Sequence, residues 1–466
     1  MGNELPKGWS VTAIKDIVKH KKGKKPKILE DDKFVNSVPY LDIKALECGE
    51  VRRYADIKSS NILDANSIAI VWDGARSGWV AKGIDGAMGS TIAALSPILV
   101  NVDYVFLFLR SQFDNLNNNT RGTGIPHVNP DVLWNIKMPI PPLSEQKRIV
   151  AKLDALFGHL DTLKTKLDHI PQLLKNFRQQ VLTQAVTGKL TEEWRLAAEA
   201  DGKDLGDREE VFLIDIITEK PRNGYSPQGV GYVTEVKSLT LSATTSGSFD
   251  PRCVKYLNIE KPNENSHLWL KNGDILIQRS NSLDYVGTSA IYDGEDFEFI
   301  YPDLMMKVRA NERVLIEYLN YCLSSVETRD YFKQNASGTA GNMPKINQGI
   351  VMNTPISLPT INEQKEIVRR VEELFSLSDR IESQYHSLKA KIDSLPQAIL
   401  NKAFKGELVP QDENDEPASV LLERIKSERE ASAAAPKKGK TKKGKKYAMK
   451  EEGLGMAAEE GGEYGE

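Results

Sequence analysis

The sequence predicts an α+β fold with a pseudo-two-fold internal repeat: two similar mixed α/β domains separated by two long helices that form an antiparallel coiled coil. Three observations predict it. The phrase EQKRIVAKLDALF at residues 145–157 returns at residues 363–375 as EQKEIVRRVEELF. Each copy opens a run of apolar residues at alternating steps of four and three, the spacing of a coiled-coil seam. The stretches ahead of the two copies also resemble each other, so the repeated unit is a globular domain followed by a long helix.

The heptad spacing identifies the seam. It runs without an error from residue 149 to 181 and again from residue 367 to 399, where Ser378 is a polar member. Because each helix has one apolar face, we expect the two faces to pack against each other. The residues expected in this contact are Ile149, Leu153, Leu156, Leu160, Leu163, Leu167, Ile367, Val371, Leu374, Ile381 and Leu388.

Local signals also predict where the helices begin and bend. Ser144 and Asn362 stand directly before a Glu-Gln pair and are expected to cap the helix starts. Pro171 and Pro396 fall inside the heptad pattern, so we expect each helix to kink or break there.

The repeat extends through the globular domains. GIPHVNPDVLWNIKMPIPPLSEQK aligns without gaps on NMPKINQGIVMNTPISLPTINEQK, and GKKP at residues 23–26 matches GYSP at residues 224–227. Apolar clusters predict buried strands, and two longer runs predict helices; these lie at 67–71 and 274–277, and at 102–113 and 316–332. The expected order is a globular domain (1–142), a helix region (143–190), a linker (191–207), a second globular domain (208–360), a second helix region (361–408), and a short helix from Ala418 to Lys426 with a charged tail (409–466).

Composition limits the class of protein. The 466 residues are 40% hydrophobic with a formal net charge of −3, so any binding of a polyanion must rest on local basic patches. Three widely separated cysteines argue against a disulfide framework and fit a reducing compartment. The N-terminal sequence has no secretion signal, and no apolar run reaches the roughly 18 residues of a membrane span. We therefore expect a cytoplasmic protein without a membrane segment.

The sequence also lacks catalytic motifs. NPDV at residues 129–132 lacks the second proline and the aromatic residue of an adenine methyltransferase tetrad. GKTKKGKK at residues 439–446 has the spacing of a phosphate loop, but it ends in Lys where Ser or Thr should hold magnesium. The six histidines show no metal-binding spacing. These absences predict a non-catalytic chain with no metal site.

Two globular domains held by a rigid helix pair suggest a device that reads two sites on one DNA duplex. A helix over residues 144–187 would be roughly 65 Å long, or about 40 Å up to the proline. Major-groove faces of B-DNA recur about every 34 Å, so the two lengths are compatible. Base and phosphate contacts require basic and amide side chains, which the loops of both domains supply.

The candidate DNA-binding residues lie in corresponding loops of the two halves. Lys24 and Lys25 are expected on phosphate, whereas Asp73, Arg76 and Arg121 are expected to read or clamp one half-site. The alternative for each is ordinary surface or a structural ion pair. The full set is Lys24, Lys25, Asp73, Arg76, Arg121 and His127 in the first half, and Arg222, Tyr225, Arg279, Asn281 and Lys345 in the second.

The order of these parts resembles the specificity subunit of type I restriction–modification enzymes. The resemblance rests on the motifs PPLSEQ and LPTINEQ at the helix starts, the heptad helices, and the motifs TGKL and KGEL at the helix ends. It covers roughly residues 5–430. It implies that each globular part is a target recognition domain and that the helix pair sets the spacing of a bipartite DNA site. It also implies two methyltransferase subunits and two ATP-dependent restriction subunits as partners. S-adenosylmethionine, ATP and magnesium would belong to those partners, with no cofactor in this chain.

Two alternatives stay open at the level of sequence: a coiled-coil adaptor whose end domains bind proteins, and a fused methyltransferase–specificity protein. The missing motifs disfavour the second. A DNA reader should lose affinity steeply with salt, whereas an adaptor should show no such DNA binding. The half-site sequences, the spacer length, the division between base and phosphate contacts, and the role of the lysine-rich and acidic tail do not follow from the sequence.

Overall fold

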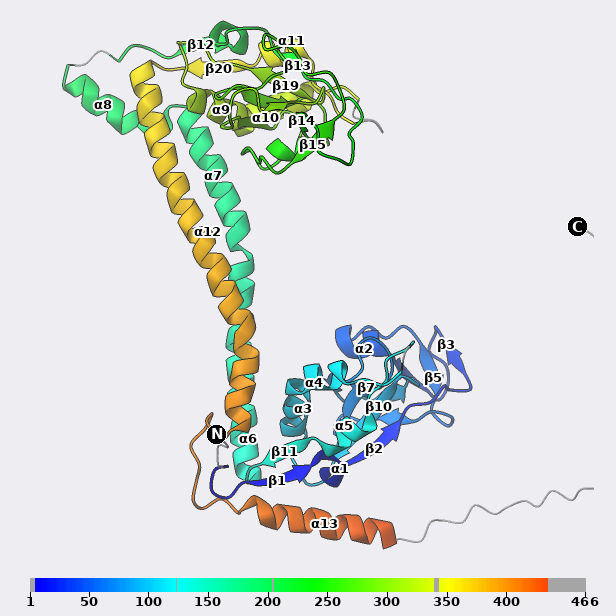
Figure 1. The fold of residues 1–466 in the computed structure, drawn as a ribbon. Helices are drawn as coiled ribbons and strands as arrows, with labels where there is room; N and C mark the ends of the chain where they lie inside the picture. Colours follow the sequence, from blue (N-terminus) through cyan, green and yellow to red (C-terminus); the bar gives the residue numbers. More distant parts are fainter. Residues whose placement is uncertain (1–4, 123, 203–204, 339–342, 435–466) are drawn as a thin grey trace, which may run out of the picture. The chain divides into compact units, whose positions relative to one another are not determined.

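A computed structural model describes residues 5–122, 124–202, 205–338 and 343–434. The lysine-rich run and the acidic tail lie outside the described residues, as does the segment that imitates a phosphate loop. The chain divides into two compact units: residues 1–156 with 397–466, and residues 157–396. The division passes through both long helix regions, so each unit contains one globular domain and part of each helix region (Figure 1).

The first globular domain contains three sheets. Its helices are α1 (Ile14–Ile17), α2 (Ile43–Cys48), α3 (Val102–Ser111), α4 (Phe113–Asn118) and α5 (Pro130–Asn135). In sheet order, the strands are β1 (Ser10–Ala13) and β11 (Lys137–Ile140); β2 (Val18–Lys22), β10 (Ile92–Pro97), β7 (Ile68–Val71) and β8 (Val80–Lys82); and β3 (Leu29–Glu30), β5 (Tyr54–Asp56), β4 (Ser37–Leu41), β9 (Gly86–Met88) and β6 (Ile62–Leu63).

The second globular domain has the corresponding three sheets. Its helices are α9 (Ile316–Ser324), α10 (Val326–Asn335) and α11 (Gln348–Met352), with 3-10 turns η2 (Leu213–Ile216) and η3 (Leu241–Thr244). In sheet order, its strands are β12 (Glu209–Phe212) and β20 (Pro355–Leu358); β13 (Arg222–Asn223), β19 (Met305–Val308), β16 (Ile275–Gln278) and β17 (Ser289–Ile291); and β15 (Val254–Leu257), β14 (Val236–Leu239) and β18 (Phe299–Ile300).

The predicted repeat is present in the sheet topology. The pair β1–β11 corresponds to β12–β20, and the order β2-β10-β7-β8 corresponds to β13-β19-β16-β17. The predicted strands are confirmed as β7 and β16, whose residues are all buried. The helix expected over 316–332 is two helices, because Ser325 ends α9 and its side chain caps α10 by accepting the N–H of Thr328.

The helix regions consist of α6 (Leu143–Asp168), α7 (Ile170–Val186) and α12 (Ile361–Phe404), with α8 (Glu192–Ala200) after the turn η1 (Lys189–Thr191) and α13 (Ala418–Ala434) near the end. The break expected at the first proline is confirmed, since α7 begins there with Pro171 in its first turn. The second proline does not break its helix: Pro396 lies inside α12. Burial of Ile392 and Leu400 on either side offsets the one backbone hydrogen bond that proline removes.

The predicted helix caps are wrong by two positions. Ser144 and Asn362 both lie inside the first turn, because α6 begins at Leu143 and α12 at Ile361. The hydroxyl of Ser144 instead donates to the carboxylate of Asp415.

The repeated Glu-Gln pair has a structural role, which the glutamine makes clear. Gln364 is buried, its Oε1 accepts the N–H of Leu315 at 2.7 Å, and its Nε2 donates to the carbonyl of Pro359 at 2.8 Å. Gln146 makes the same two bonds, accepting from Asn101 at 2.9 Å and donating to Pro141 at 2.9 Å. Asn101 and Leu315 are the N-cap residues of α3 and α9. Each glutamine therefore fastens a long helix to the globular domain that precedes it.

The helix pair within residues 157–396 is antiparallel, as predicted. Arg178 contacts Ser378, Asp168 contacts Lys389 and Lys164 contacts Asp393, so numbers fall on one helix as they rise on the other. Away from the globular domain, one residue per heptad is buried on each helix. This buried row contains Leu160, Leu167, Leu174 and Val181, and Val371, Ser378, Tyr385 and Ile392.

The second row of the predicted seam is only partly correct. Ile149 and Ile367 are fully buried, but Leu163 is 46% exposed, Ile381 39% and Leu388 47%. In this part of the pair only the first row is enclosed between the two helices, and the second row lies on the flank. Near the globular domain that flank is covered, as Ile367 packs into the core formed with α9. Away from the domain it is open.

Candidate nucleic-acid interface

Three segments of the first domain meet beside the end of β7. The carbonyl of Trp72 accepts the N–H of Val128 at 2.8 Å, and that of Pro126 accepts the N–H of Gly74 at 2.8 Å. Arg121 and His127 exchange both backbone hydrogen bonds, each 2.8 Å long, and so close a hairpin. The structure thus brings together Asp73, Arg121 and His127, which the sequence predicted as DNA contacts.

The second domain builds the same backbone scaffold with different side chains. The carbonyl of Arg279 accepts the N–H of Ile346 at 2.9 Å, as Trp72 accepts that of Val128. Asn281 donates to the carbonyl of Pro344 at 3.3 Å, as Gly74 donates to Pro126. Ser337 and Lys345 close the hairpin as Arg121 and His127 do. The predicted residues Arg279, Asn281 and Lys345 therefore lie together at the corresponding place.

At equivalent backbone positions the two scaffolds present chemically different groups. Trp72 corresponds to Arg279 and Asp73 to Ser280, since each pair donates its N–H groups to one carbonyl, that of Thr91 or of Leu304. His127 likewise corresponds to Lys345. A fixed backbone with variable hydrogen-bonding side chains is the arrangement expected of two domains that distinguish two different ligands.

Charged groups surround Asp73 in the first domain. His127 Nδ1 lies 2.7 Å from Asp73 Oδ1, and Lys22 Nζ lies 2.9 Å from Asp73 Oδ2. The Lys22 ammonium also lies 5.8 Å from the centroid of the Trp72 ring. The ring centroids of Trp72 and Trp134 lie 6.1 Å apart. A cationic and aromatic surface therefore adjoins the hairpin closed by Arg121 and His127.

Sequence reasoning selected the segments 19–27 and 72–79 but did not single out Lys22 or Trp72 in them, and it missed Trp134 altogether. Lys22 is part of the basic run that contains Lys24 and Lys25, all three exposed. The run begins as the edge strand β2, where Lys19, His20 and Lys21 are exposed as well. A reading of residues 18–22 as an edge strand would have indicated this basic surface.

Several predicted residues already have acidic neighbours. Arg76 is paired with Glu47 and Arg121 with Asp131, and all four side chains are at least one-third exposed. Arg222 Nε lies 3.5 Å from Glu219 Oε2. Exposed pairs of this kind contribute little to stability, so they can exchange for phosphate or base contacts at small cost.

Two close backbone contacts explain the GKKP and GYSP motifs. A Cβ on Gly23 would lie 2.0 Å from the carbonyl oxygen of Gly89, and one on Gly224 would lie 1.9 Å from that of Tyr301. Only glycine permits this approach. Both glycines directly follow an edge strand, β2 or β13, so they set the path of the loop that carries Lys24 and Lys25, or Tyr225.

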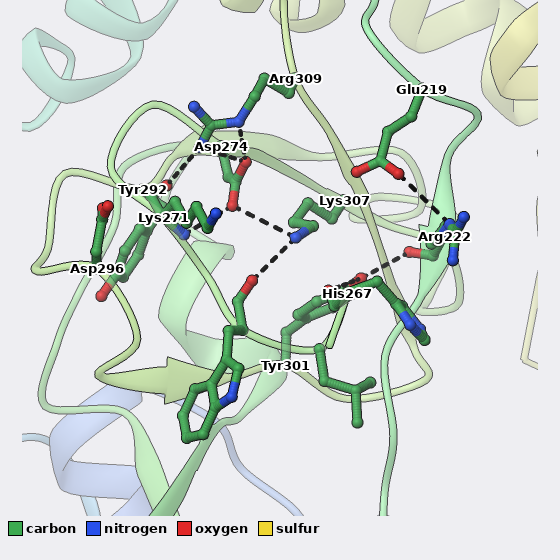
Figure 2. Close-up of polar contacts among 12 residues, drawn as sticks. Glu219, Arg222, His267, Lys271, Asp274, Tyr292, Asp296, Tyr301, Lys307 and Arg309 are labelled. Carbon is green, nitrogen blue, oxygen red and sulfur yellow. Dashed lines mark hydrogen bonds and ion pairs between the residues drawn. The ribbon is translucent and has the colours of Figure 1, made fainter. Parts of the chain in front are cut away.

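Below the Arg222–Tyr225 segment lies a buried charged network (Figure 2). Tyr301 accepts the N–H of Tyr225 through its carbonyl at 2.9 Å, and its hydroxyl donates to the carbonyl of Arg222 at 3.1 Å. Lys307 pairs with Arg222 in the β13–β19 register and donates to the carbonyl of Trp269 at 2.9 Å. Tyr301 and Lys307 thus hold this segment from beneath.

Asp274 provides the countercharge of that network. Its Oδ1 accepts from Arg309 Nε at 2.9 Å, and its Oδ2 lies 3.7 Å from Lys307 Nζ (Figure 2). Burial, the largest cause, lowers the pKa of Lys307, and the charge of Asp274 opposes that change. Burial also raises the pKa of the Tyr301 hydroxyl, which therefore remains a donor at neutral pH.

Across the described parts of the chain, no group of three or more His, Cys, Asp or Glu side chains could hold a metal ion. Among the same residues, no helix is both long and apolar enough to cross a membrane.

The family described as "Type I restriction modification DNA specificity domain" matches residues 6–172 and 242–389. The chain belongs to this family. It is 31% identical to the EcoKI specificity subunit of Escherichia coli K12, over 94% of this chain and 99% of that protein. It is 29% identical to the StySPI specificity subunit of Salmonella potsdam, over 92% and 97% respectively. The resemblance predicted from the repeated phrases is confirmed.

Solved structures confirm the fold class of this specificity subunit. The HsdS subunit of Thermoanaerobacter tengcongensis is similar with a TM-score of 0.54 at 19% identity, over 87% of this chain and 98% of that one. A chain from a study of complex assembly and conformational transition of the type I R-M system is similar with a TM-score of 0.60 at 20% identity, over 87% and 99%. The relatives are named specificity subunits, the non-catalytic class that the sequence predicted.

Proposed function

We propose that residues 1–142 and 208–360 are target recognition domains, each reading one half of a bipartite DNA site. The observation that carries the proposal is the shared backbone scaffold with different side chains at equivalent positions. The shared scaffold would dock each domain on DNA in the same way. Different bases would then be contacted by the side chains at equivalent positions, which are Trp72, Asp73 and His127 in the first domain and Arg279, Ser280 and Lys345 in the second.

In this proposal the loop residues predicted from the sequence have two roles. Lys22, Lys24 and Lys25 contact phosphates, since all three are exposed and lie on the edge strand β2 or in the loop directly after it. Asp73, Arg121 and His127 serve the first half-site, with Arg76 beside them. Arg222, Tyr225, Arg279, Asn281 and Lys345 serve the second half-site.

The regions 143–190 and 361–408 form the helix pair, and we propose that it sets the spacer and docks modification subunits. One flank of the pair supports docking. Away from the globular domain, the residues three positions after the buried row on α12 are apolar and about two-fifths or more exposed: Ile381, Leu388 and Leu395. On the opposite flank, three of the residues four positions after the buried row, Lys164, Arg178 and Lys389, carry charges that pair across the helices. A row of this kind fits the apolar face of a partner helix.

The proposed assembly contains two modification subunits and two restriction subunits around one copy of this chain. The internal repeat supports two equivalent docking positions for identical modification subunits. S-adenosylmethionine would bind the modification subunits, and ATP with magnesium the restriction subunits. The linker 191–207 would connect the first helix region to the second recognition domain.

The test is base-resolved sequencing of methylated adenines in cells that express the modification subunit with or without this chain. A split motif that disappears with the chain is the expected result. Inserting seven residues into α12 should then lengthen the spacer and leave both half-sites unchanged. An unchanged methylation pattern without the chain, with the modification subunit active, would contradict the proposal; an altered half-site after the insertion would contradict the spacer role.

A further inference from the structure

A buried carboxylate at the start of α6 has a hydrogen-bond donor for only one of its oxygens. Glu145 is 1% exposed, and its Oε2 accepts from the indole N–H of Trp9 at 3.0 Å. Its Oε1 has no hydrogen-bond partner in the described structure. Burial, the largest cause, raises the pKa of Glu145, while the Trp9 N–H and the charge of Arg148 oppose it. A buried oxygen without a donor is costly, so the site favours a further donor.

Glu145 lines a cavity of about 570 Å³ within the first unit. Residues 7–10 and Pro142 form part of its lining, and the segment from Gln411 to Ser419 forms the rest. The Gln411 amide donates to the carbonyl of Gly406 at 3.0 Å, and its second N–H faces Glu145 and helps to lower the pKa of that carboxyl. Even so, Glu145 Oε1 has no hydrogen-bond partner. The cavity is therefore open to an additional donor beside Glu145.

The charged residues that line the cavity are mainly acidic. Asp412, Glu413 and Asp415 line it together with Glu145, and Lys7 is the basic residue among the described lining. Asp415 is held by Arg148, with Nη2 to Oδ2 at 2.7 Å. The remaining carboxylates give the cavity a negative potential, which favours a cationic occupant.

The second half of the repeat shows how the equivalent carboxylate is satisfied. Glu363 is also 1% exposed, and its Oε1 accepts from Arg208 Nη2 at 2.7 Å and from the Thr191 hydroxyl at 2.8 Å. Arg208 directly precedes β12, just as Trp9 directly precedes the equivalent strand β1. The first half thus has a neutral indole where the second half has a guanidinium.

We propose that the cavity beside Glu145 binds the guanidinium group of an arginine side chain presented by a partner protein. A guanidinium offers several N–H donors in one plane and matches a carboxylate, as Arg208 does for Glu363. The second half provides its arginine from its own chain, so the open site exists in the first half only. This inference does not depend on DNA recognition, because neither the cavity nor its test includes the recognition loops.

The first test measures binding of N-acetylarginine amide by ligand-observed NMR, with the citrulline amide as a neutral analogue of similar shape. The unaltered chain should bind the arginine derivative at least tenfold more tightly than the citrulline one. Glu145→Gln, which keeps an acceptor for Trp9, should lose at least tenfold in affinity, and Glu50→Gln, an exposed carboxylate outside the cavity, should not. Equal binding of both derivatives, or unchanged binding by Glu145→Gln, would overturn the proposal.

A second variant protects the test against a folding defect. Ser419→Arg keeps Glu145 and places a guanidinium at the edge of the cavity from the chain itself, so it should block the arginine derivative. Circular dichroism and thermal unfolding should match those of the unaltered chain. A correctly folded Ser419→Arg variant that binds as well as the unaltered chain would contradict occupation of this cavity.

The source of the arginine is tested in the assembled complex. A photo-cross-linking residue at position 419 should form cross-links to an arginine-containing segment of a partner subunit. Cross-links to residues 435–466 of this chain would overturn the assignment to a partner, and tighter binding of N-acetyllysine amide would overturn the choice of guanidinium. Neither readout involves DNA, so failure here is distinguishable from failure of DNA reading.

Discussion

Arg178 on α7 donates a hydrogen bond from Nε to the buried hydroxyl of Ser378 on α12, at 3.0 Å. Ser378 is the polar residue in an otherwise apolar or aromatic row of α12, so this bond distinguishes the observed register from a shift by one heptad. The same guanidinium also contacts Asp379 at 2.6 Å and Glu382 at 3.0 Å. One side chain thus joins the buried row to the charged flank.

Arg178→Ala should lower the free energy of unfolding by about 1–3 kcal/mol, because it leaves the buried Ser378 hydroxyl without this partner. Urea unfolding monitored by circular dichroism measures the change. Arg369→Ala removes an arginine that pairs along the exposed surface of α12 with Glu366 and Glu373, and should cost less. Equal losses in the two variants would show that Ser378 contributes nothing specific.

Gly224→Ala should disrupt the second recognition loop, because its Cβ would lie 1.9 Å from the carbonyl oxygen of Tyr301. The measurement compares methylation of the preferred DNA with methylation of DNA altered in its second half-site. The variant should methylate the two DNAs at similar rates, because it no longer discriminates the second half-site. Gly23→Ala should act in the same way on the first half-site. Gly231→Ala is the matched control, since no atom lies within 4 Å of its added Cβ. Loss of both half-sites in one of these variants would indicate global unfolding instead.

Arg279→Ala should relax or abolish recognition of the second half-site only. An arginine contact to a base edge contributes about 1–3 kcal/mol of discrimination, so methylation at the preferred site should fall roughly 5- to 150-fold relative to sites altered there. Lys25→Ala should instead weaken binding at all sequences and reduce the salt dependence. Fluorescence anisotropy with split-site duplexes at several salt concentrations separates the two behaviours. A change in the first half-site would count against the assignment of Arg279.

Leu388→Lys should weaken association with the modification subunit at least tenfold, since it places a charge in the exposed apolar row of α12. Leu196→Lys provides a control, because Leu196 is an exposed leucine on α8 outside the row. Analytical ultracentrifugation of mixtures of the two subunits measures the effect. Unaltered assembly with Leu388→Lys would place the docking surface elsewhere.

The repeat, the sheet strands and the antiparallel pairing could be predicted because hydrophobic period and repeated phrases encode them directly. The exposure of Leu163 and Leu388 could not be predicted from the sequence. Heptad spacing is the same for the buried and the exposed row, and it does not show where a globular domain covers the flank of the helix pair. The continuity of α12 through Pro396 likewise depends on tertiary burial around it. Local sequence shows only the missing N–H.

The candidate nucleic-acid interface could likewise be predicted only in part from the sequence. The ungapped repeat already aligns His127 with Lys345. The loops with Asp73 and Arg279 could be chosen from composition, but the sequence does not align these two residue by residue. Trp72 and Arg279 become equivalent only through the hydrogen bonds that each makes. Nor does the sequence reveal that Glu145 lacks the partner that Arg208 gives to Glu363.

Glu366 predicts an acid-sensitive contribution to stability. Hydrogen bonds from Arg369, the largest cause, and from Arg370 lower its pKa to about 2 from an ordinary 4.5. Because the folded pKa lies below the unfolded one, the stabilisation is present above pH 4.5 and declines as the pH falls toward 2. Glu366→Gln should therefore cost about 1 kcal/mol at neutral pH, after allowance for the exposure of Arg369.

The pH dependence separates this ion pair from an ordinary packing defect. Urea unfolding of both proteins at pH 7, 5 and 4 should give a constant difference at the two higher values and a smaller difference at pH 4. Arg370 also donates to the carbonyl of Leu190 at 2.9 Å, so loss of Glu366 loosens the contact between α12 and the turn η1 as well. A difference that stays the same down to pH 4 would show that Glu366 acts through packing and not through its charge.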